Sequence, residues 1–410
     1  MNNEAQIRNI LFYLALLIVV IVTIDVFFKP YEHINLNFID KAIEKTRQSQ
    51  NIAPQRLFIN AWRLAKIEYV DSSMNNQNWY KWRNKYVNKI KTMEDANVAI
   101  NTMLASLNDP YTKFLQSKSF SEQKIILDSK ITGVGVMFNK TGDEVVVNHV
   151  LKNSSAQSQH IMAGDSIVSI NGVKTKNMTQ EQIHSLIETS KTKDIKFEIK
   201  RGNEVLVKDL KKTEIPIDTM KYRITQDNIA IITLANIMGS KAVLDFRDIL
   251  QKTNKTKGII IDLRNNYGGI LANAIIMADF MLKDKQIVRI DSRGEAKYQI
   301  YADEECVFVH KPIVILVNEK TASAAEILAG TLKDNAGAIL IGNNTYGKNS
   351  IQQVVPMTNG CGLMLTSSKY ILPMGEDIDD VGIKPDYYVE NSKMMKEAIK
   401  IINQVVKKEK

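Results

Sequence analysis

From Asn228 to Gly342, short apolar runs alternate with amphipathic segments, and this alternation most constrains the fold. The runs IAIITLA, GIIIDLR, PIVILVN and AILIG have the length and the β-branched content of buried strands. Between them, KAVLDFRDILQK, ILANAIIMADFML and ASAAEILAGTLKD carry apolar residues at the three- and four-residue steps of helices. The alternation therefore predicts an α/β fold with a largely parallel sheet.

Two other patterns precede this region. Residues 58–107 carry apolar residues at helical steps, in FINAWRLAKIEYV and again in ANVAINTMLASL, and Asn108-Asp109-Pro110 then ends the last helix. From about residue 130 the chain changes to short β-rich runs, GVGVMF, EVVVNHV, DSIVSI and IKFEIKR, with one helical stretch, TQEQIHSLIET. We expect a helical region followed by a small mixed domain.

An apolar run from Ile10 to Phe28, broken only by Asp25, is close to the ~20 residues that a spanning helix needs. A cleaved signal peptide is the alternative, but no small-x-small cleavage site follows the run. We therefore favour an uncleaved single-pass membrane anchor. We expect the amino terminus inside and everything from Lys29 outside the cytoplasm, on the periplasmic side in a bacterium, although flanking charges orient the span only weakly.

The net charge of +9 comes from dispersed lysines and arginines that do not interleave with aromatic residues, so we read it as solvated surface and predict no nucleic-acid binding. Cys306 and Cys361 are either two free thiols or one disulfide. Metal-ligand spacings and nucleotide-binding loops are missing from the sequence, which predicts neither a metal nor a cofactor.

Residues 312–333 read as a buried strand, a short turn and a helix that begins near Ser323. A serine at such a turn exposes its hydroxyl where backbone N–H groups and the helix dipole favour an anion. Ser323 is therefore a candidate nucleophile. A plain helix N-cap is the alternative for an isolated T-A-S sequence.

The segment TASAAEILAGTLKD, followed by NTYGKNSIQ, resembles the serine-lysine signature of the carboxyl-terminal processing (tail-specific) peptidases. AWRLAKIEYVD, LNDPYTKFL, KGIIIDLRNNYGG, DSRGE and DVGIKPD are also similar to that family and occur in the same order. The similarity is greatest to the branch that processes the carboxyl end of a photosystem reaction-centre protein. The resemblance implies a crotonase-like peptidase core with an inserted PDZ domain.

By this resemblance Ser323 is the nucleophile, and Lys348, 25 positions later, is the general base. A lysine accepts a proton only when neutral, so its pKa must fall from about 10.4 to roughly 7 or 8, which requires burial. Gln352, four positions after Lys348, falls on the same face and is the third member of the site. The five histidines match no triad motif, so they are expected to be surface or packed residues, like the structural carboxylates Asp262 and Glu326.

The oxyanion hole needs backbone N–H donors beside the nucleophile. The resemblance assigns this role to the Gly269 amide, or to its neighbour Gly268, together with the Ala324 amide. Glycines without side chains let a substrate carbonyl approach closely. Tyr267 stands where the family usually has proline, which affects the turn geometry only.

The small domain resembles PDZ through MAGDSIVSINGV and through a carboxylate-binding loop, Gly133, Val134, Gly135 and Val136. Successive N–H groups of such a loop receive a terminal carboxylate while the peptide adds as a β-strand. The domain departs from the usual pattern at His160, where glycine is common, at Ser155, where proline is common, and in lacking G-T before the last strand.

The predicted organisation is an anchor at 1–29, a helical region at 30–115, a PDZ-like domain at 116–212, a Ser-Lys peptidase core at 213–392 and a lysine-rich tail at 393–410. The predicted function is a membrane-anchored serine endopeptidase that cleaves proteins near free C-termini. A non-catalytic, membrane-tethered PDZ adaptor is the alternative, disfavoured because both Ser323 and Lys348 are present. The sequence leaves the natural substrate and the oligomeric state open.

Overall fold

The computed structural model describes residues 53–120, 130–190, 192–216, 219–295, 297–303 and 306–408. The predicted membrane span at residues 10–28 lies outside these ranges. Within them, the search for a helix of sufficient length and apolar character to cross a bilayer found none.

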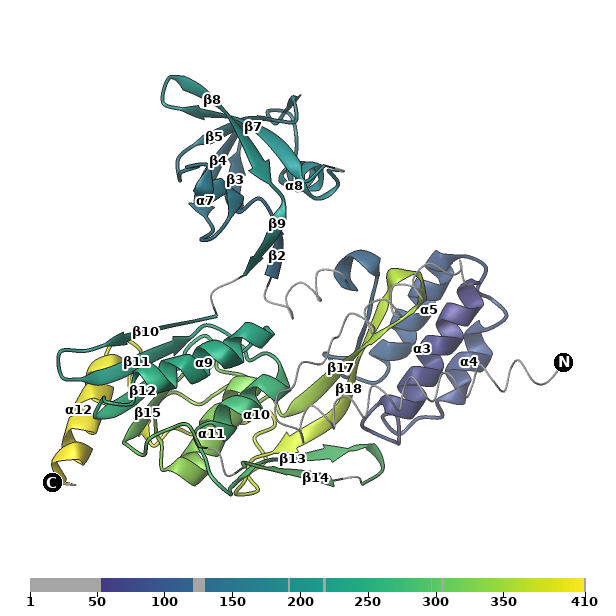
Figure 1. The fold of residues 1–410 in the computed structure, drawn as a ribbon. Helices are drawn as coiled ribbons and strands as arrows, with labels where there is room; N and C mark the ends of the chain where they lie inside the picture. Colours follow the sequence, from purple (N-terminus) through teal and green to yellow (C-terminus); the bar gives the residue numbers. More distant parts are fainter. Residues whose placement is uncertain are drawn as a thin grey trace. The chain divides into compact units, whose positions relative to one another are not determined.

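The predicted parallel sheet is present, with six strands in the order β10-β11-β12-β15-β16-β19 (Figure 1). Only the edge strand β10 runs antiparallel to its neighbour. The strands are β10 (Met220–Ile224), β11 (Ile229–Leu234), β12 (Gly258–Asp262), β15 (Ile313–Val317), β16 (Ile339–Gly342) and β19 (Tyr387–Tyr388).

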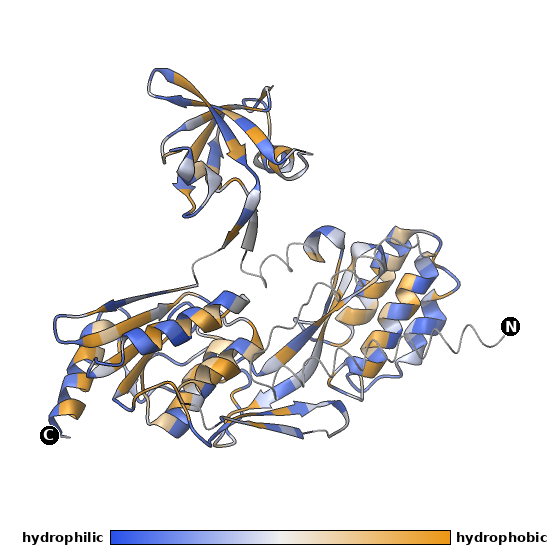
Figure 2. Cartoon of the chain, viewed as in Figure 1, coloured by the Kyte–Doolittle hydropathy of each residue, from blue (hydrophilic) through white to orange (hydrophobic). Residues whose placement is uncertain are grey.

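Helices cover both faces of this sheet, which explains why its strands are continuous apolar runs. Ile259 and Ile261 belong to the core beneath three helices, whereas Ile260 belongs to the core on the opposite face, beneath a fourth. The first three helices are α9 (Ser240–Lys252), α10 (Leu271–Asp279) and α11 (Ala324–Ala336), and the fourth is α12 (Met394–Lys408). Apolar and polar residues alternate along α9 and α12 (Figure 2).

The segment read as a lysine-rich tail is the helix α12, whose residues Met394, Ala398 and Ile402 are buried against the sheet. Its apolar residues recur at helical spacing, and the lysines between them lie on the other side. The prediction followed the lysine content and missed this periodicity.

A second sheet is antiparallel and joins the helical region to the peptidase segment. The strand order is β1-β18-β13-β14, and β17 also pairs with β18. Phe114 of β1 lies opposite Leu363 of β18, and Leu363 shares one core with the helices. The bounds are α3 (Pro54–Glu68), α4 (Tyr80–Tyr86), α5 (Met93–Ala105), β1 (Lys113–Leu115), β13 (Gln286–Ser292), β14 (Lys297–Tyr301), β17 (Ser350–Pro356) and β18 (Gly362–Ile371).

The small domain has its own core, which includes Phe138, Phe197 and Ile183. Its sheet has the order β3-β4-β5-β7-β8, with β6 beside β5, so β3 is an edge strand. Its elements are β3 (Val136–Thr141), β4 (Glu144–Val150), α7 (Ser155–Ser158), β5 (Ser166–Ile170), β6 (Val173–Lys174), α8 (Gln180–Glu188), β7 (Asp194–Arg201) and β8 (Glu204–Lys211). Strands β2 (Lys130–Gly133) and β9 (Thr213–Pro216) pair with each other at its two ends in the sequence.

Candidate active site

Ser323 lies on the turn between β15 and α11, as the sequence predicts. Its backbone has φ 56° and ψ −122°, a conformation that a non-glycine residue rarely adopts. The Thr321 hydroxyl accepts a hydrogen bond from Asn318 N at 3.0 Å and donates one to Leu263 O at 2.9 Å, so the turn is tied to the neighbouring strand β12. Such strained serine turns present the hydroxyl at a helix N-terminus.

The glycine pair after β12 lies directly against this turn. A Cβ atom on Gly268, whose φ is +91°, would lie 2.6 Å from Ala322 O and 2.9 Å from Ala324 N. Gly268 N already donates to Asn266 Oδ1 at 2.9 Å. Since Ile237 bonds to Gly268 O and to Ile270 N, the Gly269 amide points away from Ile237.

Two backbone amides at this point are free to bind a substrate oxygen. Within the described residues, neither Gly269 N nor Ala324 N donates a hydrogen bond to the protein. The Gly268 amide, in contrast, is occupied.

Lys348 precedes β17, and its amine is held by side chains. Nζ donates to Gln352 Oε1 at 2.5 Å and lies 4.6 Å from the centroid of the Tyr111 ring. Gln352 is held in turn by hydrogen bonds from Nε2 to Ser350 Oγ at 3.0 Å and to Thr366 Oγ1 at 3.2 Å. The hydrogen bond expected between Lys348 and Gln352 is therefore present.

Burial lowers the pKa of Lys348, since an apolar environment disfavours the ammonium. The negative charges of Asp109 and Glu326 act in the opposite direction, and the positive charge of Lys113 adds to the lowering. The net direction is the one that a lysine base requires.

Ser323 Oγ and Lys348 Nζ do not hydrogen-bond to each other within the part of the chain that the structure describes. Catalytic hydrogen bonds are often long in unliganded enzymes and tighten when the substrate binds. The two residues are instead connected through their main-chain nitrogen atoms, which donate hydrogen bonds to the same side chain.

Glu326 makes that connection. Its carboxylate is fully buried. Oε2 accepts hydrogen bonds from Ser323 N at 2.7 Å and from Lys348 N at 3.0 Å. Oε1 accepts from Gly347 N at 2.7 Å and from Thr345 Oγ1 at 2.5 Å. All four partners are donors, and the two carboxylate oxygens accept all four hydrogen bonds.

These hydrogen bonds agree with the sequence interpretation of Glu326 as structural, and they also link the segments that carry Ser323 and Lys348. A glutamate three residues after the helix N-cap signals a capping box, which accounts for the bond to Ser323 N. The hydrogen bonds from Gly347 N and Lys348 N come from a segment more than 20 residues later, and no local sequence pattern predicts them.

The PDZ-like domain offers an edge for a peptide. Among the described residues, β3 pairs only with β4. Phe138 of β3 stacks on His184 of α8, with ring centroids 4.7 Å apart. In the predicted carboxylate-binding loop, a Cβ atom on Gly135, whose φ is +88°, would lie 2.1 Å from Ser154 Cβ. His160 adopts φ +57°, which explains why glycine is common at that position.

The remaining candidates lie apart from this chemistry. The described histidines form no hydrogen bond with Ser323, Lys348 or Glu326, and His33 lies outside the described residues. Cys306 and Cys361 are free thiols. Arg264 forms an ion pair with Asp262 at 2.6 Å, consistent with a structural role for that carboxylate. The search of the described residues for metal-binding groups of His, Cys, Asp and Glu found none.

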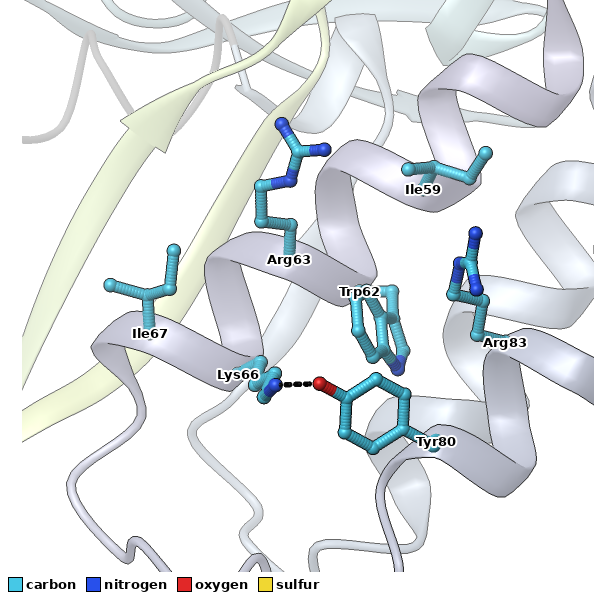
Figure 3. A pocket seen from close by; sticks show the side chains of 7 residues that line it. All are labelled: Ile59, Trp62, Arg63, Lys66, Ile67, Tyr80 and Arg83. Atoms are coloured by element: carbon cyan, nitrogen blue, oxygen red, sulfur yellow. Dashed lines mark hydrogen bonds between the residues drawn. The ribbon is translucent and has the colours of Figure 1, made fainter.

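A surface cavity of about 430 Å³ lies between α3 and α4 (Figure 3). None of the predicted catalytic residues lines it. Its lining residues are Ile59, Trp62, Arg63, Lys66, Ile67, Tyr80 and Arg83.

Comparison with known proteins gives a consistent assignment. The chain matches peptidase family S41 over residues 228–389 and the PDZ domain over residues 124–200. A carboxyl-terminal-processing protease from Picosynechococcus sp. is 32% identical over 345 residues, which cover 82% of this chain and 83% of that protein. The carboxy-terminal processing protease CtpA from Bacillus subtilis is 34% identical over 311 residues, which cover 73% of this chain and 65% of that protein.

Among solved structures, the photosystem II D1 C-terminal processing protease superposes with a TM-score of 0.57 at 27% identity. The match covers 86% of this chain and 97% of that protein. A serine on a strained turn, a buried lysine and a PDZ domain thus coincide with similarity along most of the chain. The chain belongs to the carboxyl-terminal-processing proteases of peptidase family S41, which are serine-type peptidases.

Proposed function

We propose that this enzyme cleaves proteins near their free C-termini with Ser323 as nucleophile and Lys348 as general base. The observation that carries the proposal is the buried Lys348 amine, hydrogen-bonded to the uncharged Gln352, in a segment that shares one Glu326 oxygen with the Ser323 amide. A neutral acceptor leaves the amine free to lose its proton, whereas a carboxylate partner would hold it charged.

In the proposed reaction, neutral Lys348 Nζ takes the proton from Ser323 Oγ as that oxygen attacks the substrate carbonyl carbon. The carbonyl oxygen becomes an oxyanion. When the peptide C–N bond breaks, the lysine ammonium gives its proton to the departing amine. Water, deprotonated by the same lysine, then attacks the acyl carbon. The ester bond to Ser323 Oγ breaks, the lysine ammonium returns its proton to that oxygen, and the new C-terminus is released.

The Gly269 and Ala324 amides are the proposed oxyanion donors. Both lack a protein acceptor, and Ala324 N belongs to the first turn of α11, where the helix dipole favours negative charge. The occupied amide of Gly268 favours Gly269 as the donor. The role of Gly268 is then steric, because only glycine fits against Ala322 O.

The PDZ domain is the proposed site of substrate capture. The free edge of β3 supports addition of a peptide strand, with α8 as the other wall and the Gly133-to-Val136 loop as receiver of the terminal carboxylate. We also propose that residues 10–28 anchor the enzyme in a membrane, on the strength of their length and apolar character. Membrane fractionation of a 10–28 deletion variant tests the anchor separately from the chemistry.

A site-mapped labelling experiment tests the catalytic assignment. A serine-reactive fluorophosphonate probe should modify the peptide that contains Ser323, as read by mass spectrometry. Ser323→Ala should remove the adduct, and Lys348→Arg should nearly abolish it, because arginine stays protonated. Labelling of another serine, together with loss of hydrolysis, would overturn the assignment.

A further inference from the structure

The helical region contributes an aromatic side chain to the surroundings of Lys348. Tyr111 lies between α5 and β1, and its ring centroid is 4.6 Å from Lys348 Nζ. This distance is within the ~6 Å range over which the face of an aromatic ring attracts a cation. The roles proposed above for Ser323, Gly269 and Ala324 do not explain why the Tyr111 ring lies beside Lys348 Nζ.

Hydrogen bonds hold the turn that carries Tyr111. Tyr111 N donates to Asp109 Oδ1 at 2.9 Å, and Thr112 Oγ1 donates to Asp109 Oδ2 at 2.7 Å. Thr366 N of β18 in turn donates to Thr112 Oγ1 at 3.0 Å. The turn that carries the ring is therefore fixed to β18.

The same residue of β18 supports the other partner of the lysine. Thr366 Oγ1 accepts a hydrogen bond from Gln352 Nε2, and Gln352 lies opposite Thr366 in the β17–β18 pair. Thr366 is therefore linked to both contacts of the Lys348 amine. It bonds directly to Gln352, and it bonds to Thr112, the neighbour of Tyr111. This arrangement fixes the amine from two sides.

Other charged and titratable groups face this pair. Burial, first, and the neighbouring Tyr346 hydroxyl raise the pKa of Tyr111, so the phenol is neutral and acts through its ring face, not as a counter-ion. The groups that face Lys348 are Asp109, Glu326 and Lys113, and those that face Tyr111 are Tyr346, Asp379 and Asp380.

We propose that Tyr111 is a positioning residue for Lys348, whose ring holds the ammonium against Gln352 and sets the pH at which the amine becomes available as a base. The proposal rests on the proposed role of Lys348. Because a ring face attracts the ammonium and not the neutral amine, Tyr111 favours the protonated lysine. Replacement of the ring by an apolar side chain without a ring should therefore make the base available at lower pH.

The test is the pH dependence of kcat/KM for the full chain and for Tyr111→Leu, which keeps an apolar side chain and removes the ring face. We expect the midpoint of the acidic limb to fall by about 0.5 to 1.5 pH units. Tyr111→Phe keeps the ring and should leave the midpoint in place. Tyr111→Met, another flexible apolar side chain without a ring, should shift it as Leu does.

A control and a second readout separate positioning from a general structural effect. Tyr86→Leu removes a ring that stacks on Trp82 in the helical region and should leave the midpoint unchanged. Competitive acetylation of the Lys348 amine across pH, read by mass spectrometry, gives the lysine midpoint without any need for turnover. It should fall in Tyr111→Leu as the kinetic midpoint does.

An unchanged midpoint in both Tyr111→Leu and Tyr111→Met, or an equal shift in Tyr111→Phe, would overturn the proposal. Failure of the proposed function has a different signature: Lys348→Arg would then hydrolyse peptides like the wild-type enzyme. The acetylation midpoint still reports the effect of Tyr111 in that case.

Discussion

The nucleophile turn, residues 318–324, and the base segment, residues 345–352, are built in different ways. Main-chain geometry fixes Ser323: a strand end, a positive φ and a glycine that fits against the turn. Contacts between side chains fix the amine of Lys348, and one of them comes from a residue more than 200 positions earlier. The position of the candidate nucleophile can thus be recognised from one short stretch of sequence, whereas the contacts of the candidate base come from segments far apart in the chain.

The largest effect expected from this comparison is that of Ser323→Ala. Hydrolysis should fall by roughly 10⁴-fold or more, since the hydroxyl is proposed to carry the covalent step. The melting temperature should change little, because Glu326 bonds to the main-chain nitrogen of residue 323, which the substitution keeps. Peptide cleavage and thermal unfolding measured on one preparation check both statements, and normal turnover would rule out Ser323 as the nucleophile.

Lys348→Arg should lose nearly as much activity, because an arginine does not give up its proton in the accessible pH range. Below its pKa Lys348 is protonated and cannot accept the proton of the serine, and burial lowers that pKa. Activity should rise with pH through a midpoint below the ordinary lysine value of about 10.4. A midpoint near ~6.5 that persists in Lys348→Arg would indicate a histidine base instead.

Glu326→Gln should weaken the hydrogen bonds of both the nucleophile turn and the base segment. An amide offers only one acceptor oxygen to the four donors that the carboxylate satisfies. We expect kcat to fall roughly 10²-fold and the free energy of unfolding to fall by about 2–4 kcal/mol. The exposed neighbour provides the control, since Glu319→Gln should change neither quantity. Wild-type kinetics in Glu326→Gln would show that the shared carboxylate does not position the pair.

The smallest expected effect follows from a change in the substrate rather than in the enzyme. Amidation of a peptide's C-terminus should raise KM about tenfold, because it removes the charge that the Gly133-to-Val136 loop is proposed to bind. Cleavage of a small ester, which does not need the PDZ domain, should be unaffected. Equal rates for amidated and free-acid peptides would remove carboxylate capture from the mechanism.

Much of the fold was predictable because the responsible signals are local. Apolar runs predicted the parallel strands, and the strand-turn-helix pattern predicted the place of Ser323. Lys348 was predicted from the family resemblance, and the four-residue spacing then predicted its contact with Gln352. Tyr111 lies within LNDPYTKFL, one of the segments that resemble the family. No role was predicted for it, because Lys348, the residue that its ring contacts, is distant in sequence. Helix α12 was missed because its lysines obscured an apolar side.

The four hydrogen bonds of Glu326 have a practical consequence. The hydrogen bonds with Ser323 and Lys348 involve main-chain nitrogen atoms. The link between the two segments therefore does not depend on either reactive side chain. Chemistry and architecture can therefore be separated with one substitution. A Ser323→Ala chain should still receive protein tails while being unable to release them as products. It would serve as bait, retaining physiological substrates from living cells for identification.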